Sequence, residues 1–298
     1  ATILRGSERR ISLNQFERNN TASPLIMKNI IVSASFDDMK SRHMRFLEEA
    51  SRIGAVHVLL WSDNLIRSIE GRDPRFSETE RHYVVQAVRY VDKVTIFNGK
   101  LDPDCLPESD VKADVWVVDE KTDTPARKAF CRSRGLDYRV LTDTDIAGFP
   151  ETQEPCVEVT AGRKKVIVTG CFDWFHSGHV RFFEEVSALG DLHVVVGHDE
   201  NIRLLKGEGH PLFRQDERRY VAGSIRYVRH AYISTGHGWL DAEPEIQRIR
   251  PDIYAVNEDG DQPEKREYCE KNGIQYVVLK RTPRKGLIRR TSTNLRGF

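Results

Sequence analysis

The stretch "VIVTGCFDWFHSGHVRFF" (residues 166–183) joins a short apolar run, a glycine-containing turn and two histidines that open an amphipathic segment. The β-branched residues of the run are typical of a buried strand. After the turn, Val180, Phe183 and Val186 recur at helical spacing, and Gly190 follows as a stop signal. The stretch therefore predicts a strand, a tight turn and a helix, which together form one βα unit.

This unit occurs twice in the chain. Residues 30–60 and 166–196 align without a gap and share 14 identical positions out of 31, where chance would give about two. The likeness continues in "ERHYVVQAVRYV" from Glu80 and "ERRYVAGSIRYV" from Glu217, and again in the segments that begin at Asp114 and Asp252. Internal similarity of this extent indicates two copies of one domain.

The second copy alternates strand-like and helix-like segments. A strand is expected over 192–198, and a helix over 214–228 has Val221, Ile225 and Val228 on one face. Pro251 ends a further helix before another strand, and the segment 263–273 leads to a last strand over 274–279. Alternation of this kind predicts an α/β fold: two tandem Rossmann-like domains, each with a parallel sheet covered on both faces.

The repeat sets the expected domain limits. We expect a flexible tail over 1–27, a first domain over 28–150, a polar linker over 151–163 and a second domain over 164–298. The total length suits two domains of ordinary size.

Composition excludes several classes of protein. The formal net charge is +1, from 46 basic and 45 acidic side chains, so no overall field favours nucleic acid or an anionic membrane. No apolar run approaches the ~18 residues that a membrane helix needs, and no secretory signal is visible. Five cysteines without a CxxC pair indicate reduced thiols. These features predict a soluble cytoplasmic protein.

The turn after the strand at 166–170 is an expected anion site. In parallel sheets ligands bind beyond the carboxyl ends of the strands, and a helix start there offers free N–H groups and a positive dipole end. Gly170 suits the turn, and Gly178 leaves open the space that a nucleotide needs. His176 and His179 are expected to face the same side, where a nearby phosphate would keep them protonated around neutral pH.

Two other interpretations of the histidines compete with this one. A single histidine near a strand end is more often structural than catalytic. Two histidines three apart can also share a metal ion, but no third ligand stands at a recognisable spacing.

The motifs nevertheless resemble those of a known family. "GCFDWFHSGH" (residues 170–179) is similar to the HxGH signature of cytidylyltransferase-like nucleotidyltransferases, and residues 194–221 resemble the segment of phosphoethanolamine cytidylyltransferases in which a lysine reaches the triphosphate. "RRTSTNLR" (residues 289–296) resembles their C-terminal serine/threonine motif. Tandem phosphoethanolamine and glycerol-3-phosphate cytidylyltransferases match the pattern best.

The resemblance implies an enzyme that transfers a nucleotidyl group from CTP, or alternatively ATP, to a small phosphorylated alcohol with release of pyrophosphate, accompanied by Mg²⁺. It gives catalytic roles to His176, His179 and Lys206. Asp173 would shape the turn or approach the metal. The nucleotide-binding residues that it implies are Gly170, Cys171, Phe172, Asp173, Gly178, Arg290, Thr291, Ser292 and Thr293. The family continues with a C-terminal helix after this motif, and we expect that helix to be nearly absent here, since the sequence ends at Phe298.

Several weaker candidates for site residues also have ordinary structural interpretations. Trp174, Trp239 and Tyr254 could line the acceptor pocket, although aromatic residues at such positions are as often core. Cys171 lacks a base and is expected to be a small packed residue. Arginines on an exposed helix face, here Arg218 and Arg226, usually have no specific role. The resemblance places this segment near the nucleotide and the subunit contact.

The basic C-terminal segment and Lys206 also have ordinary interpretations, as a surface loop and a solvated lysine. A basic loop can contact nucleic acid, but no aromatic residues are interleaved with the basic residues of this loop. We expect neither a nucleic-acid nor a membrane partner.

The first copy has lost the signature. Lys40 and Arg42 replace the first histidine and the glycine, only His43 remains, and no serine/threonine motif follows. We expect Arg42 to fill the nucleotide's space, so that this domain does not turn over substrate. We expect it to serve as the structural partner in an intramolecular pseudo-dimer; a homo-oligomer is a further option.

Several other functions fit the sequence less well. Nicotinamide mononucleotide and pantetheine-phosphate enzymes usually carry a proline before the histidines, a class I aminoacyl-tRNA synthetase would need a KMSKS stretch, and a nucleotide-binding regulator would not need intact histidines. The intact motif therefore favours an enzyme.

Overall fold

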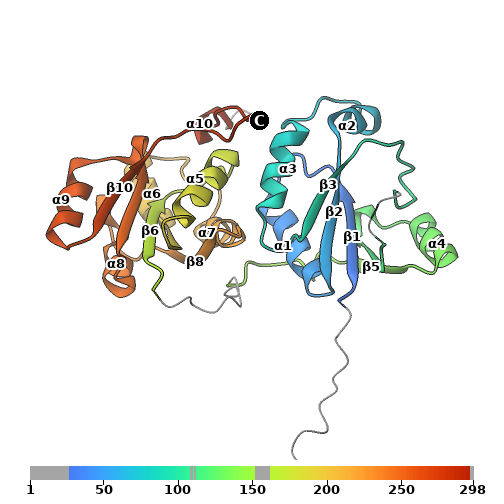
Figure 1. Cartoon of the computed structure of the whole chain (residues 1–298), viewed down its shortest axis with the longest axis horizontal. Helices are drawn as coiled ribbons and strands as arrows, with labels where there is room; N and C mark the ends of the chain where they lie inside the picture. Colours follow the sequence, from blue (N-terminus) through green and yellow to red (C-terminus); the bar gives the residue numbers. More distant parts are fainter. Residues whose placement is uncertain (1–26, 108–109, 111, 152–161, 296–298) are drawn as a thin grey trace, which may run out of the picture.

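The protein is described by a computed structural model that covers residues 27–107, 110, 112–151 and 162–295, without the side chains of residues 293 and 294. The expected tail over 1–27, apart from residue 27, and residues 152–161 of the expected linker lie outside this description. The described chain forms two five-stranded sheets, each with helices on both faces (Figure 1). The α/β fold with two tandem Rossmann-like domains is confirmed.

The first sheet has the order β3-β2-β1-β4-β5, and all of its pairs are parallel. Its strands are β1 (Asn29–Ala34), β2 (Ala55–Trp61), β3 (Lys93–Phe97), β4 (Val115–Asp119) and β5 (Asp137–Leu141). The helices of this half are α1 (Ser41–Ser51), α2 (Asp63–Glu70), α3 (Glu78–Gln86), the 3-10 turn η1 (Glu120–Thr122) and α4 (Pro125–Arg134).

The second sheet repeats this order as β10-β9-β6-β7-β8, again with parallel pairs. Its strands are β6 (Lys165–Gly170), β7 (Asp191–Val196), β8 (Val228–Ile233), β9 (Ile253–Asn257) and β10 (Gln275–Leu279). The helices are α5 (Ser177–Ser187), α6 (Asp199–Lys206), α7 (Gln215–Gly223), η2 (Gly238–Leu240), α8 (Glu243–Ile249), η3 (Glu258–Gly260), α9 (Pro263–Lys271) and α10 (Ser292–Leu295).

The central strands are buried on both faces, which explains their uninterrupted β-branched runs. Val166, Ile167 and Val168 of β6 are fully buried. The chain leaves β6 in one direction for β7 and returns to its other side at β9, so the strand order reverses between β6 and β9. This reversal is the switch point at which doubly wound sheets bind ligands.

One predicted helix is shorter than its periodicity indicated. The expected helix over 214–228 ends at Gly223, because the next residues bond to the first half instead of continuing the helix. Arg226 N–H donates to the Ala87 carbonyl, Arg89 N–H donates to the Ser224 carbonyl, and Val88 pairs with Ile225 in an antiparallel bridge. Val228 then begins β8, a strand that the sequence analysis did not predict.

The two halves contact each other through reciprocal pairs related by a pseudo-two-fold axis. Corresponding residues exchange corresponding bonds, as in the isologous interface of a symmetric dimer. The pairs are Ser41 to Glu217 and Ser177 to Glu80, both at 2.6 Å, Tyr220 to Glu48 at 2.8 Å and Tyr83 to Glu184 at 2.7 Å.

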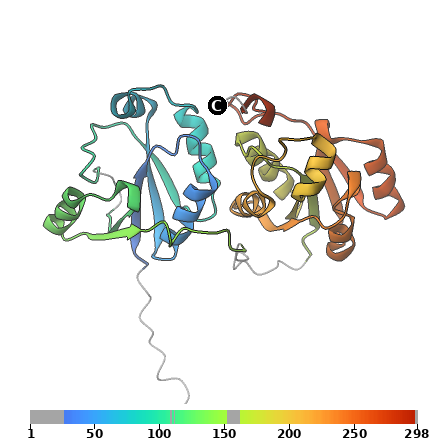
Figure 2. The ribbon, with the colours of Figure 1, turned by 180° about the vertical axis from the view of Figure 1, so that it is seen from behind.

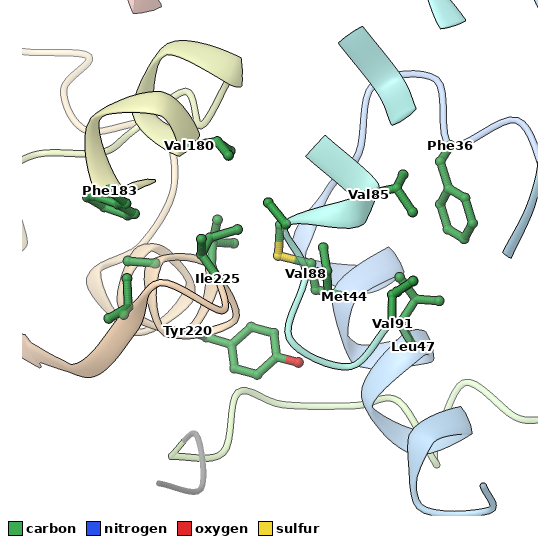
Figure 3. Packing of buried hydrophobic residues seen from close by; sticks show 14 of the residues in the cluster. Phe36, Met44, Leu47, Val85, Val88, Val91, Val180, Phe183, Tyr220 and Ile225 are labelled. Atoms are coloured by element: carbon green, nitrogen blue, oxygen red, sulfur yellow. The ribbon is translucent and has the colours of Figure 1, made fainter. Parts of the chain in front are cut away.

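Apolar side chains from both halves form one continuous buried cluster across this interface. Figure 3 shows Val85 and Val88 of the first half facing Val180 and Ile225 of the second, with Tyr220 beside them. The views from front and back place α3 and α5 on opposite sides of the junction, with α10 above it (Figures 1 and 2). The halves therefore share a core as well as polar bonds.

Within the described ranges, no helix has the length and apolar character needed to cross a membrane. The cysteines of the same ranges, Cys105, Cys131, Cys171 and Cys269, are all free thiols.

Candidate active site

A cavity of about 310 Å³ opens at the carboxyl ends of β6 and β9, at the switch point of the second sheet. Eight of the residues singled out in the sequence contribute to its lining: Gly170, Cys171, Phe172, Asp173, His179, Lys206, Thr291 and Ser292. These residues come from three segments far apart in the sequence. The structure thus brings the glycine turn, the second histidine, the lysine and the hydroxyl segment to one place.

The turn after β6 is fixed by packing and by one carboxylate. Phe172 has a positive φ of 51°, and a side chain at Gly170 would meet its ring at 2.9 Å. The Asp173 carboxylate is buried and accepts the backbone N–H groups of Leu212 and Phe213 at 2.9–3.0 Å. Asp173 therefore ties this turn to the loop that follows α6, which is the turn-shaping role expected from the sequence.

The two histidines lie against each other at the start of α5. Their ring centroids are 4.0 Å apart with an interplanar angle of 25°. The Gly178 N–H donates to His176 Nδ1 at 3.0 Å, so the neutral imidazole of His176 carries its proton on Nε2. This Nε2 is buried and has no hydrogen-bond partner within the described residues, and the same holds for His179 Nδ1. Buried polar atoms without a partner are rare and suit a ligand-binding site.

Burial and nearby positive charge favour the neutral form of both imidazoles. Burial, together with the charges of Arg281 and Arg290, lowers the pKa of His176 to about 3. Burial and the neighbouring His176, Arg281 and Lys206 lower the pKa of His179 well below its usual value. The expectation of protonated histidines therefore depends on the charge that a bound phosphate would bring.

Gly178 has a different role from the one expected. It is not part of the cavity lining, and a Cβ there would lie 2.8 Å from His176 Cε1. The missing side chain makes room for the His176 ring, which keeps the ring stacked on His179. The glycine thus shapes the site through the histidine.

Basic side chains contribute to the lining of the cavity. Lys206 ends α6, and Arg281, which follows β10, also belongs to the lining. Arg281 pairs with Asp259 and donates to the Arg290 carbonyl oxygen at 3.2 Å. Lys265 donates to the Gly260 carbonyl at 3.2 Å, and burial lowers the pKa of its ammonium group. Three cations facing one cavity suit a polyanionic ligand.

The C-terminal hydroxyl segment closes one wall. Thr291 and Ser292 line the cavity, and the Ser292 hydroxyl donates to the Trp174 carbonyl at 3.4 Å. Thr293 lies within α10, but its side chain is outside the described set. Arg290 does not line the cavity, and its guanidinium forms an ion pair with Glu80 of the first half at 2.8 Å.

The three aromatic candidates for the acceptor pocket do not line this cavity. Tyr254 is buried in the core, where its hydroxyl bonds Thr169 at 2.7 Å. Trp174 faces the first half, with the Lys40 ammonium 4.4 Å from its ring centre. Trp239 is 47% exposed on η2. Their assignment to substrate remains a prediction without a contact in the cavity.

Arg218 is not the exposed arginine that its helix suggested. It is 1% exposed and donates to the carbonyls of Phe213, Cys171 and Gly197 and to the Asp199 carboxylate at 2.7–2.8 Å. It therefore fixes the turn and the ends of β6 and β7 around the cavity. Burial raises the pKa of the Cys171 thiol, which makes a thiolate nucleophile unfavourable.

The first half keeps an equivalent cavity of about 300 Å³, whose lining includes Arg42 and Arg127. Arg42 lines this cavity without filling it, because its guanidinium extends to Asp143 at 2.6 Å. Lys40 pairs with Asp38 at 2.8 Å. Within the described chain, no side chain that lines this cavity has a buried polar atom without a partner, in contrast to the histidine pair of the second half.

Five further residues line the cavity and were not predicted from the sequence: His210, Asn257, Asp259, Lys265 and Arg281. Their positions in the sequence could have indicated them, because Asn257 ends β9 and Arg281 follows β10, at the edge of the sheet where ligands bind.

Comparison with known proteins is consistent with this geometry. Residues 167–288 match the family described as cytidylyltransferase-like. The FAD synthase of Thermococcus kodakarensis is 37% identical over 123 residues, which are 40% of this chain and 80% of that protein. The FAD synthase of Ferroglobus placidus is 36% identical over 120 residues, 39% of this chain and 75% of that protein. The bifunctional protein HldE of Campylobacter concisus is 37% identical over 100 residues, 33% of this chain but only 21% of that protein.

Proposed function

Because this chain is a nucleotidyltransferase of the cytidylyltransferase-like family, we propose that its second half transfers an adenylyl group from ATP to a phosphomonoester and releases pyrophosphate. The observation that carries the proposal is the convergence of His179, Lys206, Arg281 and the Thr291–Ser292 segment on one cavity at the switch point.

The reaction needs no covalent intermediate on the protein. A phosphate oxygen of the acceptor attacks the α-phosphorus of the nucleotide and forms a new P–O bond. The bond between the α-phosphorus and the bridging oxygen breaks, and the electron pair leaves with pyrophosphate. The protein's contribution is to align two anions and to stabilise charge that grows on the bridging and leaving oxygens.

The residues in and beside the cavity suit these two tasks. His179 lies in the cavity wall, whereas His176 does not line the cavity and stacks on the His179 ring. The Nε2–H of the neutral His176 has no partner within the described residues, and in this proposal it becomes a donor to the bound phosphate. Lys206 and Arg281 bring positive charge to the β- and γ-phosphates. The hydroxyls of Thr291 and Ser292 are donors and acceptors at the start of α10, where oxygens of the leaving group would bind.

Mg²⁺ would arrive with the nucleotide rather than occupy a site built by the protein. Among the described residues, no group of three or more His, Cys, Asp or Glu side chains is arranged to hold a metal ion. Asp173 already accepts two backbone N–H groups, so it is a weak ligand candidate. Mg²⁺ commonly binds through substrate phosphates with few protein ligands, and it would neutralise phosphate charge during transfer.

The relatives favour ATP over CTP. FAD, the product named for the FAD synthases, joins an adenylyl group to a flavin phosphate, so ATP and a phosphomonoester acceptor are the substrate classes that these relatives suggest. CTP remains the second candidate, favoured by the likeness of residues 289–296 to the serine/threonine motif of cytidylyltransferases, with phosphoethanolamine or glycerol 3-phosphate as acceptor.

The first half is proposed to have no turnover of its own. Its cavity lacks the histidine pair, and Lys40 and Arg42 are held by carboxylates. Its contribution would be the shared core and the bonds across the pseudo-two-fold interface.

Release of pyrophosphate from each nucleoside triphosphate tests the proposal. The acceptor panel contains FMN, a sugar 1-phosphate, glycerol 3-phosphate and phosphoethanolamine. We expect release with ATP and one acceptor, and slower release in the Lys206→Ala variant. Release with CTP alone would select the second candidate. Binding of ATP without release under any acceptor would favour a non-catalytic nucleotide-binding regulator.

A further inference from the structure

We propose that Glu80, in the half without the histidine pair, is a positioning residue for the nucleotide site of the other half. It would hold the start of α5 and the segment before α10 at a fixed distance from each other. This inference rests on the proposed function of the cavity, and it deepens that function by giving the first half a part in it.

The geometry of one carboxylate carries the proposal. Glu80 lies in α3 and is 3% exposed. It accepts the Ser177 hydroxyl at 2.6 Å and both the Nε and Nη2 groups of Arg290 at 2.8–3.2 Å. Ser177 directly follows His176, and Arg290 directly precedes Thr291. A single side chain from the first half therefore joins the helix that presents the histidines to the segment that presents the hydroxyls.

The network continues to the cavity itself. The Arg290 carbonyl oxygen accepts Arg281 Nη2 at 3.2 Å, and Arg281 lines the cavity. The same carbonyl oxygen lies 3.5 Å from the place that a Cβ on Gly178 would occupy. Movement of Arg290 would therefore displace a cation of the cavity and the segment packed on the histidine turn. Misplacement of reacting groups by about 1 Å can cost about 100-fold in rate.

Glu217 is related to Glu80 by the pseudo-two-fold axis and differs from it in one contact. Glu217 accepts the corresponding Ser41 hydroxyl, also at 2.6 Å, but in the described part of the chain it has no arginine partner. The first half has no counterpart of residues 289–295 that could supply one. The two carboxylates thus make the same bond across the interface, and only Glu80 adds a bond to the segment that closes a cavity.

A buried ion pair is weak evidence for stability, because desolvation offsets much of the attraction. A better documented effect of buried ion pairs is that they favour one conformation of the chain over others. The Glu80–Arg290 pair suits that use, since both partners belong to segments whose relative position decides the shape of the cavity.

The experiment compares Glu80→Gln with the matched control Glu217→Gln in the full chain. Each variant replaces one interface carboxylate by a neutral amide of nearly the same size. We expect Glu80→Gln to raise the KM for ATP and lower kcat, with kcat/KM down at least 10-fold, while Glu217→Gln stays within twofold of the wild type. The double variant Glu80→Gln/Arg290→Gln should lose no more than Glu80→Gln alone, because both changes remove the same contact.

Amide hydrogen exchange supplies a readout that does not need activity. Glu80→Gln should speed exchange at residues 287–292 and at the start of α5, and Glu217→Gln should leave both segments unchanged. Unchanged exchange in Glu80→Gln would overturn the proposal, and so would an equal loss of kcat/KM in the two single variants. If the wild type releases no pyrophosphate, the proposed function fails, and the exchange comparison still decides whether Glu80 positions these segments.

Discussion

Replacement of His176 by asparagine and by glutamine separates two roles that one imidazole combines. Nδ1 of His176 caps α5 by accepting the Gly178 N–H at 3.0 Å, whereas Nε2 is the donor without a partner. In ordinary side-chain geometry, the asparagine amide oxygen falls close to the place of Nδ1, and the glutamine amide nitrogen falls close to the place of Nε2. Asparagine therefore keeps the cap and loses the donor, and glutamine does the reverse.

The magnitudes follow from these contacts. Loss of one preorganised donor to developing charge costs about 100-fold to 1000-fold in kcat, so His176→Asn should fall by that factor while its free energy of unfolding stays within about 0.5 kcal/mol of the wild type. Loss of an N-terminal cap costs about 1 kcal/mol, so His176→Gln should be less stable by that amount and retain more activity than His176→Asn.

Pyrophosphate release measures kcat, and urea unfolding followed by circular dichroism measures stability. His176→Ala, which lacks both functions, serves as the reference that should show both losses. A kcat for His176→Asn within threefold of the wild type would mean that Nε2 contributes little to transfer and would exclude this role for His176.

Three further outcomes are expected. Lys206→Ala should lower kcat/KM for the nucleotide about 10-fold to 100-fold, the value of a charge-assisted bond, while Arg203→Ala, an exposed residue of the same helix, should change it less than twofold in the same assay. The pKa of His176 is about 3 in the folded chain and near its usual 6.5 when unfolded. Between pH 6.5 and pH 3, the unfolded chain therefore binds one proton more than the folded chain, and the free energy of unfolding decreases as the pH is lowered. From pH 6.5 to 4.5, urea unfolding of the wild type should lose on the order of 2 kcal/mol more than that of His176→Asn, and equal losses would contradict the low pKa. Arg218→Met and Arg81→Met should each destabilise by about 3 to 5 kcal/mol, because both arginines are buried with three carbonyl oxygens and one carboxylate as partners; a loss below about 1 kcal/mol for either would count against this role.

The repeated βα pattern was sufficient to predict the fold, because buried parallel strands have continuous apolar runs that the sequence shows directly. Strand β8 was missed, since its residues include His230 and Tyr232 and are mostly only partly buried. Helix α6 was missed because it has eight residues, of which only Asn201 and Ile202 are buried. Short elements at the edge of a sheet leave little periodicity to detect.

The candidate site could be predicted where residues belong to an ordered motif, as with His179, Lys206 and Ser292. It could not be predicted where a contact depends on how the two halves meet. Arg290 precedes the hydroxyl segment in sequence, yet its guanidinium bonds Glu80 from the other copy. The parallel "ERHYV" and "ERRYV" segments show that both copies carry this glutamate, but only the assembled interface shows which one reaches the cavity.

We expect one triphosphate site in the chain, in its second half. Isothermal titration calorimetry with a non-hydrolysable ATP analogue in the presence of Mg²⁺ measures the number of sites. One analogue should bind per chain, with binding lost in a His179→Ala/Lys206→Ala variant and unchanged in Arg42→Ala. Two analogues per chain, or binding that survives the double substitution, would mean that the site lies elsewhere.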